Sequence, residues 1–181
     1  MESDNSRAQK PAGFPVERLI VRVLITLVIL TAVFLYLLAL EIGKPEALAT
    51  VKMTWGVILL WIVLCGALMY RFRDQTRAFM QGLPFNWRVK FVLFVTILAL
   101  IEEAIAVSMT NLAPFFGSKI GEAYITASTN YFDLILFHSV IVFVPLFIAW
   151  AIILSFYDFS PFAVFLLFGF MGIACEAAIN P

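Results

Sequence analysis

Apolar residues along the chain fall into long runs, and short polar segments separate one run from the next. Each run is 18 to 23 residues long. This length matches the roughly 20 residues that a helix needs to cross the ~30 Å hydrocarbon core of a bilayer. The runs occupy residues 19–40, 53–70, 91–113, 134–156 and 161–181. The pattern predicts an all-α fold, a polytopic membrane helix bundle of about five transmembrane helices.

The two ends of the chain differ in character. Residues 1–18 are polar and contain two prolines, so we expect a disordered cytoplasmic tail there, followed by a single transmembrane helical domain over residues 19–181. The first apolar run is too long for a cleavable signal peptide. The last run reaches Pro181 without a polar tail, which leaves open whether the chain ends at the membrane face or continues into further helices.

Composition supports the membrane class. Hydrophobic residues make up 63% of the chain and charged residues 13%, whereas about a quarter of a soluble domain is charged. A formal net charge of zero gives no reason to expect nucleic acid as a partner. The two cysteines, Cys65 and Cys175, lie inside apolar runs and indicate neither a disulfide framework nor a zinc site.

The distribution of basic residues predicts the orientation. Nine of the twelve lie in the N-terminal segment or in the connector after the second run: Arg7, Lys10, Arg18, Arg22, Arg71, Arg73, Arg77, Arg88 and Lys90. The positive-inside rule therefore predicts a cytoplasmic N-terminus. It places the hydroxyl-rich loop at residues 114–133 outside and a short interfacial helix at residues 77–80 inside. We expect a multi-pass protein of a bacterial inner membrane.

Ionisable residues inside the runs are the candidates for chemistry, because a charge at membrane depth costs a few kcal/mol on insertion scales. They are Glu102, Glu103, His138 and Glu176, with Asn180 as a neutral companion. At 1.5 Å per residue the glutamate pair lies roughly 17 Å, and Glu176 roughly 22 Å, from the cytoplasmic face. His138 lies roughly 7 Å below the outer face. Because these depths are similar, we expect Glu103, His138 and Glu176 to approach one another.

Helical phase separates the two adjacent glutamates. At 100° per residue, Thr110 and Asn111 fall within about 80° of Glu103, whereas Glu102 lies at the edge of that polar arc. We therefore expect Glu103, rather than Glu102, to point into the bundle. Two adjacent carboxyl groups in a low dielectric do not both ionise readily, so the pair is a candidate acid/base or proton-carrying site.

A glutamate pair on one helix, a histidine on the next and a polar pair one turn apart on the third resemble the motifs of a protease family. This is the CAAX-protease and bacteriocin-processing (CPBP) family, with Glu-Glu-x-x-x-Arg, Phe-x-x-x-His and His-x-x-x-Asn or Asp. Glu102 and Glu103 match the first motif, His138 the second and Asn180 the third. The positions that depart from these motifs are Val107, Leu134 and Glu176. The resemblance implies a glutamate-dependent intramembrane protease with Glu102, Glu103 and His138 as catalytic residues.

Each candidate also has a purely structural interpretation. The glutamates can form hydrogen bonds between helices, and His138 can donate to a loop carbonyl. Glu176 and Asn180, one turn apart near a helix end, can cap that end.

Our leading hypothesis is a non-enzymatic membrane protein whose buried polar cluster supports transport, proton coupling or the assembly of a membrane complex. The cluster consists of Glu103, Thr110, Asn111, His138, Glu176 and Asn180. The alternatives are the glutamate-dependent protease and a structural subunit. We expect no cofactor and no metal, because the Glu-x-x-His spacing of dimetal bundles is absent. The expected partners are the lipid bilayer and other membrane subunits or a second copy of the chain.

Overall fold

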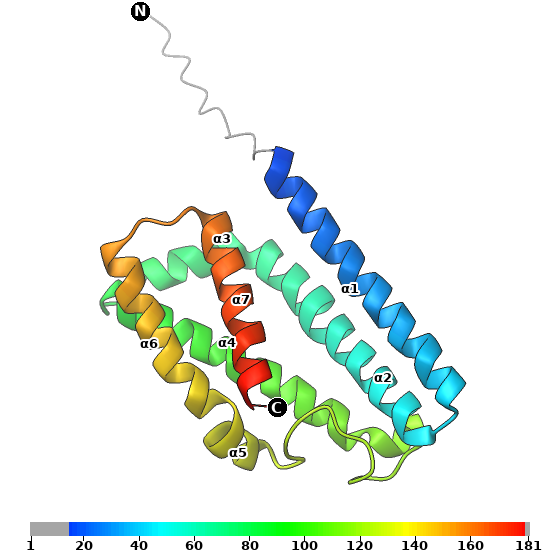
Figure 1. Ribbon diagram of the computed structural model, residues 1–181. Coiled ribbons are helices and arrows are strands. Elements are labelled where there is room, and N and C mark those ends of the chain that lie inside the picture. The colour runs from blue at the N-terminus through cyan, green and yellow to red at the C-terminus, as the bar shows by residue number, and fades with distance from the viewer. Residues whose placement is uncertain (1–14, 180–181) are drawn as a thin grey trace, which may run out of the picture. The chain divides into compact units, whose positions relative to one another are not determined.

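The computed structural model describes the backbone of residues 15–179 and the side chains of residues 16–174 (Figure 1). The predicted tail up to residue 14 lies outside the described residues. Within them every regular element is a helix, so the chain is an all-α bundle of membrane type, as predicted. The elements are α1 (Pro15–Ile42), α2 (Pro45–Val57), η1 (Ile58–Cys65), α3 (Gly66–Gly82), α4 (Trp87–Asn111), η2 (Ala113–Phe116), α5 (Tyr131–Asp133), η3 (Leu134–His138), α6 (Val140–Phe156) and α7 (Pro161–Ile179).

The chain divides into two compact units. One contains the described residues up to Val33 together with those from Pro161 onward, and the other is Phe34–Ser160. The second unit contains α2 to α6 and every contact that is used below.

Three helices among the described residues are long and apolar enough to cross a membrane: Val16–Ile42, Pro45–Gly82 and Trp87–Asn111. The bent pair Tyr131–His138 and Val140–Phe156 makes a fourth if it is taken as one span. These segments cover the first four predicted runs, apart from Leu112, Ala113 and the break at Ser139. The described apolar part of α7, Pro161–Ala174, is shorter than a span. The fifth transmembrane helix therefore stays a prediction.

The helix ends differ from the predicted span ends. The first helix begins at Pro15, inside the predicted tail, and proline is favourable in the first turn of a helix. The second is continuous from Pro45 to Gly82, so residues 77–80 belong to this long helix and do not form the separate short helix that was predicted, while the membrane span at residues 53–70 stays a prediction. Polar residues continue a helix outside the membrane as readily as apolar ones, and neither glycine nor proline occurs between Tyr70 and Gly82.

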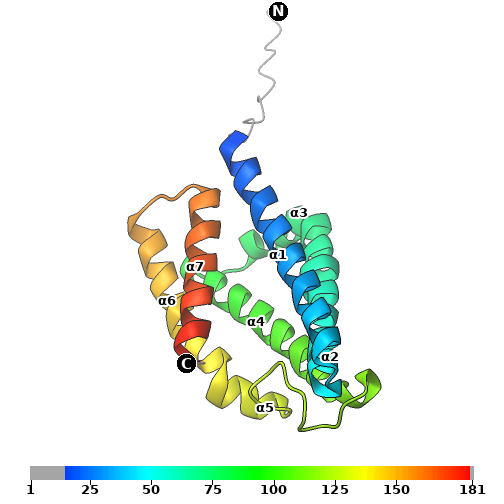
Figure 2. The same cartoon turned by 45° about the vertical axis from the view of Figure 1, so that its right-hand side comes forward.

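The loop between α4 and α5 folds onto the neighbouring ends of α2 and α4, as Figure 2 shows. Its core is formed by Ala49, Met53, Met109, Ala113 and Ala123. The loop turns at Gly117, whose φ of 94° is readily adopted by glycine but rarely by other residues. This segment is therefore a packed cap on one end of the unit.

A hydrogen bond between two threonine hydroxyls fastens this cap to α4. Thr110 is fully buried, and its Oγ1 lies 2.9 Å from Oγ1 of Thr126. Thr126 donates in turn to the carbonyl of Ser128 at 2.9 Å. The chain of two bonds makes Thr110 the donor to Thr126.

We expect Thr110→Val to lower the free energy of unfolding by about 1 kcal/mol, the net value of a typical hydrogen bond. Unfolding in mixed micelles by titration with a denaturing detergent measures this change. The control is Thr54→Val, because Thr54 is exposed and its hydroxyl bonds only to Thr50 of its own helix. Equal losses in the two variants would contradict the assignment.

Candidate functional site

The helix of the fourth predicted span is broken near its start. The predicted continuous helix over residues 134–156 is wrong: the π-helical turn η3 ends at His138, α6 begins at Val140, and the two segments meet at 48°. Ser139 joins them with φ of −129° and ψ of −85°, which is outside the helical region.

The backbone around Ser139 shows how the break is accommodated. Its N–H donates to the carbonyl of Leu134 at 3.0 Å, five residues back, and its carbonyl accepts from Val142 at 2.9 Å and Phe143 at 3.2 Å. Further along, Pro145 has no N–H to offer the carbonyl of Ile141. Proline disturbs the turn that precedes it, which is the turn after the break.

Glu103 of α4 meets the break directly. The Ser139 hydroxyl, which is buried, donates a hydrogen bond to Oε1 of Glu103, which is half-buried. A second bond lies one turn away, where the Tyr131 hydroxyl donates to the carbonyl of Leu100 at 3.0 Å. α4 therefore holds the broken span at two points, one on either side of the π-helical turn.

Of the two adjacent glutamates, Glu103 contacts the broken span, as the helical phase predicts. Glu103 is half-buried and accepts from Ser139, whereas Glu102 is exposed. Further along the same arc, Thr110 bonds to Thr126, and Asn111 Nδ2 donates to the Thr129 carbonyl at 3.0 Å. The polar arc thus serves two purposes, because Glu103 contacts the broken span while Thr110 and Asn111 fasten the cap.

His138 lies beside Asp133 on the N-terminal side of the break. Its Nε2 is 3.7 Å from Oδ2 of Asp133, and both side chains are just under half exposed. The side chain of Glu176 and all of Asn180 lie outside the described residues. The predicted approach of Glu103, His138 and Glu176 therefore stays a prediction.

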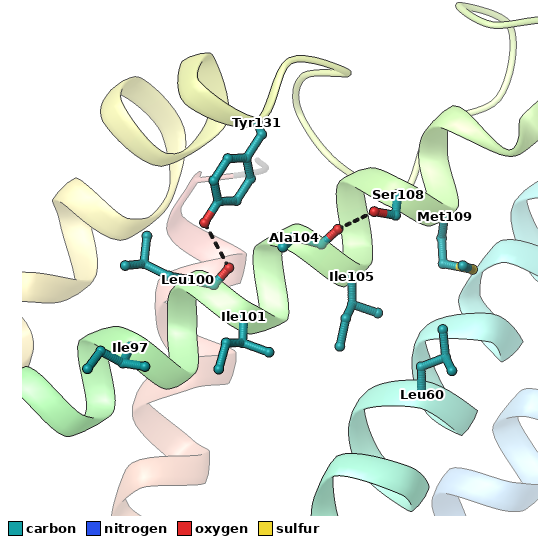
Figure 3. A pocket seen from close by; sticks show the side chains of 9 residues that line it. All are labelled: Leu60, Ile97, Leu100, Ile101, Ala104, Ile105, Ser108, Met109 and Tyr131. Carbon is teal, nitrogen blue, oxygen red and sulfur yellow. Dashed lines mark hydrogen bonds between the residues drawn. The ribbon is translucent and has the colours of Figure 1, made fainter.

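An open hollow of about 450 Å³ runs along α4 beside the break (Figure 3). Its lining consists of Leu60, Ile97, Leu100, Ile101, Ala104, Ile105, Ser108, Met109 and Tyr131. The two hydroxyls in this lining are already bonded to carbonyls of α4, Ser108 to Ala104 at 2.6 Å and Tyr131 to Leu100 at 3.0 Å. Both hydroxyls thus donate their proton to α4, and the other lining side chains are apolar, so the hollow suits hydrocarbon.

The described residues contain no group of three or more His, Cys, Asp or Glu side chains that could hold a metal ion. Charge-based analysis of the sequence overlooked Ser139 and Tyr131, which carry the two bonds to α4. In the sequence, Ser139 is marked only by its position next to His138 inside an apolar run, and nothing marks Tyr131. Hydroxyl side chains are common in membrane helices, so a hydroxyl alone does not indicate a functional residue.

Comparisons of the chain with protein-family models, with curated proteins and with solved structures found no match.

Proposed function

We propose that this chain is a non-enzymatic, multi-pass membrane protein in which proton exchange at Glu103 controls the broken fourth span, as proton-coupled transport requires. The observation that carries the proposal is the hydrogen bond from Ser139 to Glu103 at the break.

The strength of this hydrogen bond depends on the charge of the carboxyl group. An ionised carboxylate accepts a charge-assisted bond that is about twice as strong as a neutral one. Protonation of Glu103 therefore weakens its hold on Ser139, and loss of the proton restores it. Because Ser139 is the residue that joins η3 to α6, this change acts on the angle between the two segments.

A broken span is a suitable element for such control. Interrupted membrane helices leave backbone groups that need other partners, and they occur where a protein lines a path or a binding site. π-helical turns within helices are likewise frequent at functional sites. Here the π-helical turn, the non-helical residue and the carboxyl group coincide.

The neighbouring side chains of Asp133 and His138 offer a route for the proton. Asp133 and His138 are partly exposed on the N-terminal side of the break, and His138 directly precedes Ser139 in the chain. Chains of carboxyl and imidazole groups relay protons in membrane pumps and transporters. We infer that protons reach Glu103 through Asp133 and His138.

Proton flux into vesicles that contain the purified protein tests this function. An imposed potential drives protons inward, and a trapped pH dye reports them. Glu103→Gln keeps the size and polarity of the side chain but cannot exchange a proton, so we expect the flux to fall by about tenfold or more. Ser139→Ala should lower it to a smaller extent, because the carboxyl group remains.

Glu102→Gln is the matched control, since Glu102 is the exposed neighbour on the same helix. It should leave the flux close to that of the unmodified protein. Flux that persists in Glu103→Gln would overturn the proposal. The glutamate-dependent protease stays a prediction of the sequence resemblance, and it requires both glutamates; loss of peptide cleavage in Glu102→Gln and Glu103→Gln alike would favour it.

A further inference from the structure

The helix formed by α2, η1 and α3 is longer than the hydrocarbon core of a bilayer is thick. It has 38 residues and a length of about 57 Å, almost twice the ~30 Å thickness of the hydrocarbon core. Its apolar part ends at Tyr70, and Arg71 begins a polar stretch that stays helical to Gly82. A short turn then leads to α4, which enters the membrane again. Residues 70–90, here called the basic corner, therefore lie at the level of the lipid headgroups.

The helical part of the basic corner has two different sides. At 100° per residue, Phe72 and Phe79 fall within about 20° of each other. Arg73 and Arg77 fall within about 40° of each other, and they lie roughly 100–160° around the helix from the two phenylalanines. All four side chains are exposed, Phe79 to 67%. Separate apolar and basic faces are typical of a helix that lies in a membrane interface.

Charge in the basic corner is strongly one-sided. Its basic residues are Arg71, Arg73, Arg77, Arg88 and Lys90, and its one acidic residue is Asp74. Arg73 Nε lies 3.7 Å from Oδ1 of Asp74, but both side chains are more than half exposed, so this pair is worth little. Lys90 Nζ donates to the carbonyl of Gln81 at 3.1 Å, which ties the start of α4 to the end of α3.

Three of these arginines have the guanidinium group over an aromatic ring. The guanidinium carbons of Arg71, Arg73 and Arg88 lie 5.8, 4.9 and 5.9 Å from the ring centres of Phe72, Tyr70 and Trp87, respectively. Tyrosine and tryptophan favour the boundary between hydrocarbon and water. The rings thus anchor the arginines where phosphate groups of lipids lie.

We propose that the basic corner binds the headgroups of anionic phospholipids. Four or more basic residues next to a membrane helix attract anionic lipid, at about 1 kcal/mol for each residue near the surface. Lipid is the partner that the structure favours over a soluble polyanion. The helices on both sides of the corner enter the bilayer, so its cations reach headgroups without any further association.

Spin-labelled lipids test this proposal in vesicles of phosphatidylcholine that contain the full chain. The protein-bound fractions of labelled phosphatidylglycerol and labelled phosphatidylcholine are compared at low and at high salt. We expect about a fivefold preference for phosphatidylglycerol at low salt, the factor that corresponds to about 1 kcal/mol. Salt should weaken the preference by screening. The variant Arg71→Gln/Arg73→Gln/Arg77→Gln should abolish it.

Two further variants test whether the lipid preference depends on the basic corner itself, and not on the net charge of the protein or on a folding defect. Lys44→Gln/Lys52→Gln/Lys119→Gln removes the same number of charges from residues outside the corner and should keep the preference. Arg71→Lys/Arg73→Lys/Arg77→Lys keeps the charge in place and should keep it too. Equal binding of both lipids by the unmodified protein, or equal losses in the two glutamine variants, would overturn the proposal. Binding of a soluble polyanion such as heparin without any lipid preference would also overturn it.

Discussion

Replacing Met53 by alanine is expected to lower the free energy of unfolding by about 2–5 kcal/mol, the range for removing a large buried side chain. Met53 is fully buried, and its cluster contains one other large side chain, Met109. The other buried members of the core are alanines, which are too small to fill the space that Met53 leaves, and the larger side chains packed against the core, Val57, Phe116 and Ile125, are only partly buried. The cap over α2 and α4 should therefore loosen.

Titration with a denaturing detergent measures this loss, and proteolysis of the loop at residues 112–130 reports where the structure loosens. Met69→Ala is the matched control, because Met69 is 39% exposed on α3. It should change stability by much less than Met53→Ala. Similar losses in both variants would mean that Met53 is not a packing residue of the cap.

The close contact between α2 and α4 gives the second large expected effect. A Cβ atom at Gly56 would lie 2.4 Å from Sδ of Met109, far inside the van der Waals distance. Gly56→Leu should therefore push α2 away from α4 and cost about 1–3 kcal/mol, as overpacking of a core does. Shortening the opposing side chain in Gly56→Leu/Met109→Ala should recover part of that loss.

Coupling between the two sites is read from a double-mutant cycle, in which neighbours in contact deviate from additivity by about 0.5–3 kcal/mol. Gly66→Leu serves as control, because no atom lies within 4 Å of a Cβ built at Gly66. The contact between the helices would be refuted by additive effects of Gly56→Leu and Met109→Ala.

The apolar runs were sufficient to predict the helices and their class. A bilayer offers backbone N–H and C=O groups no partners, so a run long enough to cross it must form a helix whatever it packs against. Helix ends were predicted less well, since the run marks where hydrocarbon ends and not where the helix ends. The continuation of α3 from Arg71 to Gly82 is the clearest example.

The inward position of Glu103 also follows from the sequence, because residues of one helix keep a constant angular spacing. Which side chains contact Glu103 cannot be predicted from the sequence in this way. Ser139 lies 36 residues from Glu103, and Tyr131 lies 31 residues from Leu100. Contacts over such separations depend on how two helices pack. The break at Ser139 depends on the same packing, because the residue at the break is neither glycine nor proline, the residues that would predict a break from the sequence. Local periodicity thus determined the helices and the inward face of α4, whereas only the packing of α4 against the fourth span decided which groups form the site.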